Sequence, residues 1–388
     1  KPTGAGVIVM DPNSGAIKTM TSIPGYNLNL FARGISSQEF KELSNNKLKP
    51  LFNRNLMAEV PPGSVFKLVT GSTAIENLDV KADTTFYDKN ATFSRPGWET
   101  TFRNWYPVGE GKLTFTRAIA RSNNIIFYKL GYRLYQKYKG SKLVEFARKF
   151  GLGSETRIDL PGEKSGLVPD GDWKRKKFGH GWLPGDSINL SIGQGNLLTT
   201  PLQIAQMVSV IANEGTMYKP FILDKVIDSE GKLIKDIKPV VKKKLDFKNN
   251  VFDILKKGMK KVTQSEGGTA SKVFLDFPVS IAGKTGTAQT SVRNANHGWF
   301  VGFAPVDDPE VLVLVFLENG SSSAYTLPIA AKIFKEYFDL NKKKMEPKKT
   351  GKVKINELAN NKTFNASHTS FNLFNYFERV FSQRNKGG

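Results

Sequence analysis

The segment Ser64-Val65-Phe66-Lys67 places a lysine three residues after a serine. On a helix, residues three apart share a face, so the lysine nitrogen can come within hydrogen-bond reach of the serine hydroxyl. A serine hydroxyl is too weakly acidic to attack a carbonyl unaided, and a neighbouring base is the usual remedy. Lysine serves as that base only when it is neutral, and burial or a second nearby cation can lower its pKa enough. The spacing therefore predicts an activated nucleophile.

The Ser-x-x-Lys spacing alone is a weak signal, because residues 44–47 and 229–232 repeat it. Around Ser64, Val-Pro-Pro-Gly at residues 60–63 ends an extended segment, and the apolar pattern that follows predicts a buried helix with Ser64 at its N-terminus. Backbone N–H groups and the helix dipole favour developing negative charge there. In contrast, residues 44–47 lie in a polar run and residues 228–231 form a predicted hairpin turn. Taken alone, Ser64 could equally be a plain helix-capping serine.

Two further polar motifs stand beside apolar runs. Ser122 and Asn124 follow the apolar residues 118–120, and a Lys-Thr-Gly triplet that begins at Lys284 follows the strand-like residues 277–282. These patterns also recur elsewhere, at residues 44–46, 187–189 and 349–351. Only one set keeps the order Ser-x-x-Lys, Ser-x-Asn, Lys-Thr-Gly with every member beside an apolar element.

These three motifs, in this order, resemble those of the penicillin-recognising serine acyltransferases. Further segments look like those of the monofunctional class B penicillin-binding proteins, namely residues 61–67, 159–163, 192–195, 200–203, 283–288 and 297–305. Residues 160–169 are most similar to the members of that class that serve cell elongation. The resemblance covers roughly residues 1–340.

The resemblance implies an acyl-transfer mechanism. Ser64 would attack the carbonyl between the two terminal D-alanines of a peptidoglycan stem peptide, with Lys67 as general base. The backbone N–H groups of Ser64 and Thr287 would form the oxyanion hole, which stabilises charge that develops only in the tetrahedral intermediate. An amine from a neighbouring stem peptide would then attack the acyl-enzyme and form the cross-link. A β-lactam would acylate Ser64 and stay.

The second motif would supply the proton relay. By the same resemblance, Ser122 would sit between Lys67 and Lys284 and pass a proton to the departing amine. The amide of Asn124 would hold the substrate backbone. Two lysines near one serine also make sense from electrostatics, since each cation disfavours the charge of the other and helps to keep Lys67 a base.

The third motif would bind the substrate. Lys284, Thr285 and Thr287 would hold its terminal carboxylate, as the resemblance implies. The glycine has a physical reason of its own, because a side chain at Gly286 would crowd a ligand laid along the edge of that strand.

The chain predicts an α/β (α+β) fold with a central five-stranded antiparallel sheet covered by helices, as in the penicillin-binding protein transpeptidase and serine β-lactamase-like fold. The expected strands are residues 6–10, 16–21, 280–290, 298–304 and 311–318, the first two joined by a turn at 11–15. The expected helices are residues 202–213 and a closing helix at 325–340.

The expected domain division places the transpeptidase domain at residues 1–340, with a helical subdomain at about 79–200 that carries Ser122. Residues 341–388 then read as a basic, flexible tail, in which four phenylalanines between 371 and 381 have helical spacing. That short aromatic face could dock on the domain, on a membrane or on a partner, and a weak helix in a solvated tail is the favoured interpretation.

The resemblance also implies partners and a location. The partners would be peptidoglycan stem peptides on lipid II-derived glycan strands, β-lactam antibiotics, and a membrane glycosyltransferase of the elongation machinery. The catalytic domain would lie in the periplasm or extracytoplasmic space of a bacterium, anchored to the cytoplasmic membrane. The chain starts without methionine and holds no run of 18 apolar residues, so we expect the anchor and pedestal of the family to be missing from it.

The net charge of +22 invites a nucleic-acid interpretation. No zinc-finger, homeodomain-like or RNA-binding-sheet signature accompanies it. Residues 341–388 contain 11 Lys or Arg against 3 acids, and the remaining excess is diffuse. We therefore expect a solvated basic surface that favours anionic membranes and wall polymers, and no nucleic-acid partner.

No cofactor or metal is expected. The chain has no cysteine, and residues 83–121, where some relatives of the family carry zinc, hold neither histidine nor cysteine. Trp98 and Trp105 lie in a loop at residues 93–106 that could line the substrate groove, although core packing explains tryptophans as well.

Three other functions compete with transpeptidation. A serine β-lactamase or a β-lactam sensor uses much the same nucleophile and Lys-Thr-Gly strand, but no Glu-x-x-x-Asn element is placed here like the deacylating one of class A enzymes. A non-catalytic wall-binding module would have no use for a general base such as Lys67. A D,D-carboxypeptidase is a minor variant of the same mechanism, in which water replaces the acceptor amine.

Overall fold

The core of the protein is a five-stranded antiparallel sheet with the strand order β11-β12-β13-β1-β2. The computed structural model describes residues 2–32, 34–290 and 295–345. The strands are β1 (Gly4–Met10), β2 (Ile17–Ile23), β11 (Ala282–Ala288), β12 (His297–Ala304) and β13 (Val311–Glu318). Strands from the two ends of the sequence pair in the middle of the sheet, where Val7 of β1 lies opposite Val315 of β13. Strand β11 is an edge strand, so one of its sides is open to a ligand or another segment.

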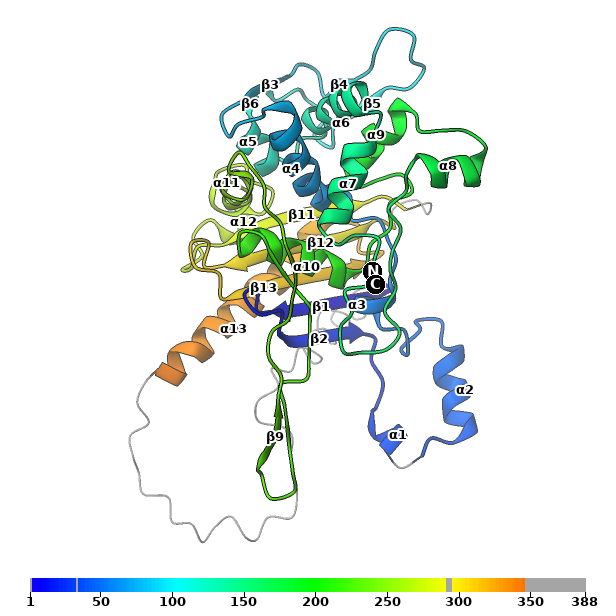
Figure 1. Ribbon diagram of the computed structural model, residues 1–388, viewed down its shortest axis with the longest axis vertical. Helices are drawn as coiled ribbons and strands as arrows, with labels where there is room; N and C mark the ends of the chain where they lie inside the picture. Colours follow the sequence, from blue (N-terminus) through cyan, green and yellow to red (C-terminus); the bar gives the residue numbers. More distant parts are fainter. Residues whose placement is uncertain (1, 33, 291–294, 346–388) are drawn as a thin grey trace, which may run out of the picture. The chain divides into compact units, whose positions relative to one another are not determined.

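Burial explains why the central strands read as apolar runs. Every residue of β1 and β12 is buried, as is all of β13 except Glu318. Helix α10 (Pro201–Ala212), whose 12 residues are all buried, packs against β12, β13 and β1 and lies in front of the sheet in Figure 1. Both faces of these strands are therefore buried. Their sequences are almost entirely apolar and do not alternate between apolar and polar residues as in a half-exposed strand.

The segment that carries Ser122 is mainly helical and lies above the sheet in Figure 1. Its helices are α5 (Phe115–Ala120), α6 (Asn124–Tyr138), α7 (Ser141–Lys149), α8 (Gly171–Phe178) and α9 (Pro184–Leu190). Two small sheets join them, β3 (Thr85–Asp88) with β6 (Gly111–Thr114), and β4 (Thr92–Phe93) with β5 (Phe102–Arg103).

The remaining elements connect these parts. Towards the N-terminus they are α1 (Asn29–Ala32), α2 (Ser37–Asn45), α3 (Arg54–Met57), η1 (Gly63–Phe66) and α4 (Lys67–Leu78). Later in the chain they are β7 (Thr216–Tyr218), β8 (Lys225–Ile227), β9 (Leu233–Asp236), β10 (Val241–Lys244), α11 (Val251–Gln264), α12 (Ser271–Phe274), η2 (Ser323–Thr326) and α13 (Leu327–Met345). Helix α11 packs against α4, α5 and β11, and so links the sheet edge to the helical segment.

The predicted fold class is confirmed, and the five predicted strands form one sheet. The strand predicted at residues 280–290 is shorter, and the apolar residues 277–281 precede it as an irregular segment after α12. The closing helix begins later than predicted, after the short η2, and continues to Met345. The helix therefore includes residues 342–344, the first lysine run of the expected basic tail. The predicted aromatic segment at 371–381 lies outside the described residues.

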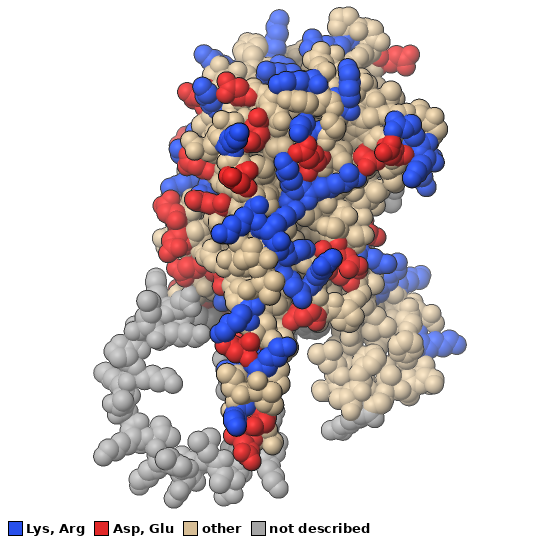
Figure 2. All heavy atoms as spheres, in the orientation of Figure 1, with Lys and Arg blue, Asp and Glu red and all other residues tan. Residues whose placement is uncertain are grey.

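The surface of the protein carries charged side chains of both signs. Figure 2 shows a band of Lys and Arg side chains across the middle of the face in view, with Asp and Glu on both sides of it. Among the described residues, no helix combines the length and hydropathy needed to cross a bilayer.

Candidate active site

Ser64 lies in the tight turn η1, directly before the first α-helical residue Lys67. The turn is held against the edge strand β11 and against a neighbouring loop. Gly63, with a φ of 54°, donates its N–H to the carbonyl of Gly193 at 3.0 Å. A Cβ atom at Gly63 would lie 2.7 Å from the carbonyl oxygen of Thr287. Glycine at position 63 therefore permits both the left-handed backbone and the close approach that brings Ser64 beside β11.

The amine of Lys67 is fully buried and is held by the second motif. Its Nζ donates to the backbone carbonyl of Ser122 at 2.6 Å and to Oδ1 of Asn124 at 2.7 Å, and it lies 3.4 Å from Ser122 Oγ. It also lies 5.3 Å from the ring centre of Phe127. Within the part of the chain that the structure describes, no hydrogen bond joins Lys67 Nζ to Ser64 Oγ. Catalytic hydrogen bonds are often long in ligand-free enzymes and tighten on substrate binding.

Ser122 connects the two lysines of the site. Its hydroxyl accepts a hydrogen bond from Lys284 Nζ at 2.9 Å, in addition to its 3.4 Å contact with Lys67 Nζ. The residue follows α5 in a left-handed backbone conformation, with a φ of 51°. That conformation costs a non-glycine residue roughly 1–2 kcal/mol. The fold therefore holds Ser122 in a strained conformation at the point where its hydroxyl meets both amines.

Burial controls the proton affinity of both amines. Lys284 Nζ donates a hydrogen bond to the backbone carbonyl of Thr285. Burial lowers the pKa of Lys284 to about 7. The pKa of Lys67 is well below its usual value, first because of burial and then because of the nearby Lys284. The carboxylate of Glu110 acts in the opposite direction and raises the pKa of Lys67. The predicted effect of a second cation therefore holds for Lys67, where burial is the larger cause, while burial alone lowers the pKa of Lys284.

A cavity of about 540 Å³ opens in front of these groups. Of the residues predicted for the site, those that line it are Ser64, Ser122, Asn124, Thr285 and Thr287. The other lining residues are Arg103, Asn104, Trp105, Tyr128, Ile192, Gln194, Thr269, Gln289, Asn296, Ser322, Ser323 and Ala324. A larger hollow of about 950 Å³, lined by residues of α6, α7 and α8, contains none of the three motifs. Chemistry and not volume therefore selects the smaller cavity.

Two predicted substrate contacts look different in the structure. Lys284 is fully buried and is not among the cavity-lining residues, so it faces the cavity through Ser122 and not directly. Gly286 is also buried, and a Cβ atom there would lie 2.9 Å from both the carbonyl oxygen of Pro62 and a methyl group of Val65. On this face of β11 the glycine makes room for the η1 turn, which packs against the strand.

Several cavity residues lacked a sequence signal. The hydroxyls of Thr269 and Thr285 lie 2.7 Å apart, and Thr287 Oγ1 donates to Ser323 Oγ at 3.3 Å. Thr269 lies between α11 and α12, and Ser323 is the first residue of η2, both outside the three motifs, so only the fold could reveal them. The two tryptophans of the loop before β6 differ from each other. Trp105 lines the cavity, whereas Trp98 packs edge-on against aromatic side chains of the hydrophobic cluster around Ile188.

Metal-ligating side chains do not cluster in the ranges the structure covers, 2–32, 34–290 and 295–345. No group of three or more His, Cys, Asp or Glu residues there could hold a metal ion. His297, the first residue of β12, is buried, and its Nδ1 accepts a hydrogen bond from the backbone N–H of Asn319 at 3.1 Å. Burial lowers the pKa of His297, which suits a structural position in the sheet.

The fold and the three converging motifs define a serine acyltransferase site. The chain belongs to the penicillin binding protein transpeptidase domain family, whose model matches residues 5–339. Among its relatives is the peptidoglycan D,D-transpeptidase MrdA of Escherichia coli K12, which is 33% identical over 332 residues, covering 82% of this chain and 52% of that protein. The chain thus spans about half the length of the curated relatives it matches. The resemblance to class B penicillin-binding proteins predicted from the motifs is confirmed, and the relatives include MrdA and PBP2 proteins.

Solved structures agree with this assignment. The PBP2 of Pseudomonas aeruginosa in complex with WCK 5153 is 34% identical, with a TM-score of 0.76 and coverage of 86% of this chain and 70% of that one. A structure described as the coordination of polymerization and crosslinking by a peptidoglycan synthase complex contains a chain that is 31% identical, with a TM-score of 0.76 and coverage of 91% and 57%. Both likenesses extend over most of the described residues.

Proposed function

We propose that this chain carries the peptidoglycan D,D-transpeptidase activity of a class B penicillin-binding protein. One observation carries the proposal, namely that Ser122 Oγ lies 2.9 Å from Lys284 Nζ and 3.4 Å from Lys67 Nζ at the wall of a cavity that also exposes Ser64. Two buried lysines of lowered pKa behind a nucleophile are costly to maintain and have no use in a binding module.

Acylation begins at Ser64. A neutral Lys67 donates its two N–H groups to the carbonyl of Ser122 and to Asn124, which leaves its lone pair for the Ser64 proton. As that proton moves to Lys67, Ser64 Oγ bonds to the carbonyl carbon between the two D-alanines, and the carbonyl π electrons move to the oxygen. The backbone N–H groups of Ser64 and Thr287 stabilise this oxyanion.

Collapse of the tetrahedral intermediate releases D-alanine. The carbonyl re-forms, the carbon–nitrogen bond breaks, and the departing amine takes a proton from Ser122 Oγ, which is replenished by Lys67 or Lys284. The threonine hydroxyls of Thr285 and Thr287, which line the cavity, bind the terminal carboxylate with the positive charge of Lys284 behind them. Asn124 lines the same cavity and holds the peptide backbone.

The second half-reaction forms the cross-link. The neutral amine of a neighbouring stem peptide attacks the acyl-enzyme carbonyl and loses a proton to neutral Lys67. The carbonyl then re-forms, the ester carbon–oxygen bond breaks, and Lys67 returns the proton to Ser64 Oγ. A β-lactam enters by the same attack, but its ring-opened leaving group stays attached, so the ester persists.

The same proposal sets partners and location. Stem peptides on lipid II-derived glycan strands are the substrates, β-lactams are the inhibitors, and a membrane glycosyltransferase supplies the strands. A similar structure that describes the coordination of polymerization and crosslinking by a peptidoglycan synthase complex supports that pairing. The catalytic part then works in the periplasm or extracytoplasmic space, with residues 1–340 as the transpeptidase domain, about 79–200 as its helical subdomain, and the basic tail after it.

The test is the intact mass of the protein over time after addition of stoichiometric penicillin. Ser64→Ala should form no adduct, while wild type and the matched control Ser229→Ala should each gain one drug molecule that stays for many minutes. An adduct that disappears within seconds as free drug is hydrolysed would indicate a β-lactamase. No adduct on wild type would reject the Ser64 mechanism. With a D-Ala-D-Ala peptide, release of D-alanine without transfer to an added amine would indicate a carboxypeptidase.

A further inference from the structure

Asn123, the middle residue of the Ser-x-Asn motif, is fully buried and uses its whole amide group. Its Nδ2 donates one hydrogen bond to Asp88 Oδ2 at 2.7 Å and another to Glu110 Oε2 at 2.8 Å. Its Oδ1 accepts from the backbone N–H of Ile126 at 3.0 Å and so caps α6. The motif pattern leaves this position unspecified, but in the structure its side chain makes three hydrogen bonds.

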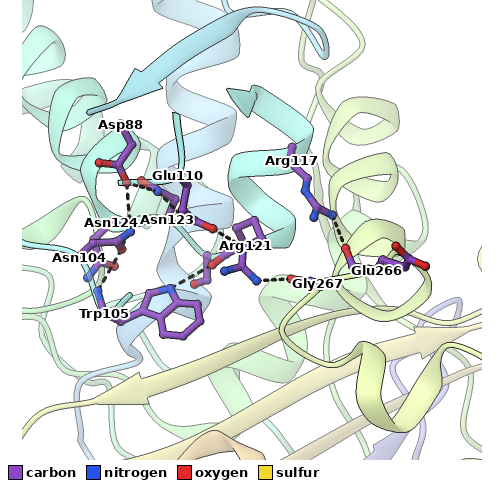
Figure 3. A network of polar contacts seen from close by, with 12 residues as sticks. Asp88, Asn104, Trp105, Glu110, Arg117, Arg121, Asn123, Asn124, Glu266 and Gly267 are labelled. Carbon is purple, nitrogen blue, oxygen red and sulfur yellow. Dashed lines mark hydrogen bonds and ion pairs between the residues drawn. The ribbon is translucent and has the colours of Figure 1, made fainter. Parts of the chain in front are cut away.

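The two carboxylates are themselves fixed by other elements, as Figure 3 shows. Glu110 Oε1 pairs with Arg121 Nε, and Arg121 Nη1 donates to the carbonyl of Gly267 at 2.5 Å. Asp88 Oδ1 accepts from the backbone N–H of Ala91 at 2.9 Å. Strand β3, the segment before β6 and the loop after α11 therefore converge on one amide.

The network also reaches the cavity wall. Asn104 Nδ2 donates to Asp88 Oδ2 at 3.3 Å, and Asn104 Oδ1 accepts from the backbone N–H of Asn124 at 2.9 Å. The indole N–H of Trp105 donates to the carbonyl of Arg121 at 3.0 Å. Both Asn104 and Trp105 line the cavity. The cavity wall and the second motif are therefore held by the same network of hydrogen bonds.

The network holds the two residues that flank Ser122 in the sequence. Arg121 and Asn123, the residues on either side of Ser122, are both held in the network, and Ser122 has the left-handed φ of 51°. A serine released from such constraints would relax to a commoner backbone conformation, which would move its hydroxyl away from the two lysines.

We propose that Asp88, Glu110 and Asn123 are positioning residues that hold the Ser122 hydroxyl between Lys67 and Lys284. None of the three lines the cavity, so they act through Ser122 and do not touch the substrate. This role rests on the proposed function, because it concerns the proton relay of acylation.

Glu110 leaves an electrostatic signature that a purely structural role would not have. The charged groups that act on Lys67 are Lys284 of β11, which lowers its pKa, and Glu110, which raises it. Arg121 is the cation paired with Glu110, and Asp88 accepts from the same amide nitrogen of Asn123 as Glu110 does. Glu110→Gln removes the negative charge, so the pKa of Lys67 falls further and the neutral base persists to lower pH. The acid limb of the acylation rate should therefore move to lower pH in this variant.

The experiment measures the rate constant of acylation by penicillin against pH, together with the thermal unfolding temperature. Asn123→Asp keeps the side-chain shape and the helix-capping oxygen, but turns an oxygen towards two carboxylates. Its matched control is Asn53→Asp, because Asn53 caps α3 through a 3.0 Å bond to the N–H of Asn55 and lies outside the network. We expect Asn123→Asp to slow acylation at least about tenfold, and the control to match wild type.

The double variant Asn123→Asp with Glu110→Gln provides a rescue. It places a donating amide opposite the new carboxylate, so part of the lost rate should return. Where Asn123→Asp does not fold, Glu110→Gln tests the role alone through the shift of its acid limb to lower pH. Wild-type rates and an unmoved pH profile in both single variants would overturn the positioning role while leaving the proposed function intact. A wild type that forms no adduct would overturn both.

Discussion

Two of the three segments with the Ser-x-x-Lys spacing lie in opposite environments. Ser64 and Lys67 lie at the junction of η1 and α4, where Lys67 is fully buried. Ser229 and Lys232 lie in the turn between β8 and β9, and both are exposed. In that turn the carboxylate of Asp228 accepts the N–H groups of Glu230 at 3.0 Å and of Lys232 at 2.8 Å, which satisfies the backbone and leaves both side chains to solvent.

The difference shows that distant elements and not the spacing create the chemistry. The partners of the Lys67 amine are Ser122 and Asn124, and the cation that depresses its pKa is Lys284, more than 200 residues away in sequence. A Ser-x-x-Lys motif is therefore only a candidate until a fold buries the lysine and supplies its partners.

Replacing the base tests this contrast with the largest expected effect. Lys67→Arg keeps a positive charge but cannot be deprotonated in a protein, so it removes the general base. We expect penicillin acylation to slow by about 10²–10⁴-fold, the usual contribution of general acid–base catalysis. Lys232→Arg, with the same spacing on the exposed turn, should acylate at the wild-type rate.

The measurement is the acylation rate constant from intact mass, with circular dichroism to show that each variant is folded. If Lys67→Arg were folded and acylated as fast as wild type, Lys67 would not be the base. Another group would then have to take the Ser64 proton.

The second prediction concerns pH and separates the two buried lysines. The pKa of Lys284 is lowered to about 7, so its ammonium loses a proton as the pH rises through that value. The positive charge behind Thr285 is then lost, while the neutral amine keeps its N–H groups, and acylation should fall by up to about tenfold per pH unit on the alkaline side. In Lys284→Arg the guanidinium stays charged, so this alkaline limb should disappear.

The pH profile of the acylation rate in wild type, Lys284→Arg and Lys232→Arg decides the matter. Since Lys67 and Lys284 interact, the two limbs belong to the pair, and the comparison of profile shapes is more informative than either midpoint. Retention of the alkaline limb in Lys284→Arg would assign it to another group.

The sequence was informative where a pattern is local and apolar. The sheet strands, the hairpin turn at 11–15 and the helix started by Pro201 follow from hydrophobic runs bounded by turn residues. Motif order also predicted that Ser64, Lys67, Ser122 and Lys284 would come together. What the sequence could not provide are the side-chain directions in the fold, because these depend on packing between elements.

Gly286, Lys284 and Asn123 illustrate that limit. A glycine after a strand threonine reads as a place for a ligand, but the space at Gly286 is filled by Pro62 and Val65. Lys284 reads as a carboxylate ligand, but burial places it behind Ser122. Asn123 carries no signal, since its importance comes from Asp88, 35 residues earlier, and from Glu110.

The smallest expected effect is on stability, and it extends the comparison from catalysis to folding. The pKa of Lys284 in the folded state, about 7, is below the ordinary lysine value of 10.5. Between these two pH values the unfolded state binds a proton that the folded state lacks, so the free energy of unfolding of wild type rises with pH there. Below pH 7 the full cost of burying the charge is present, and above 10.5 it is absent.

Lys284→Met removes the titrating group but keeps an unbranched side chain of similar length. Its free energy of unfolding relative to wild type should therefore be most favourable below pH 7. The difference should shrink by up to about 1.4 kcal/mol per pH unit as the pH rises from 7 towards 10.5. Lys232→Met, on the exposed turn, should differ from wild type by the same amount at every pH. Urea unfolding at four pH values measures both differences. A constant difference for Lys284→Met would mean that Lys284 keeps its proton in the folded protein across the whole window, and the alkaline limb of acylation would then need another origin.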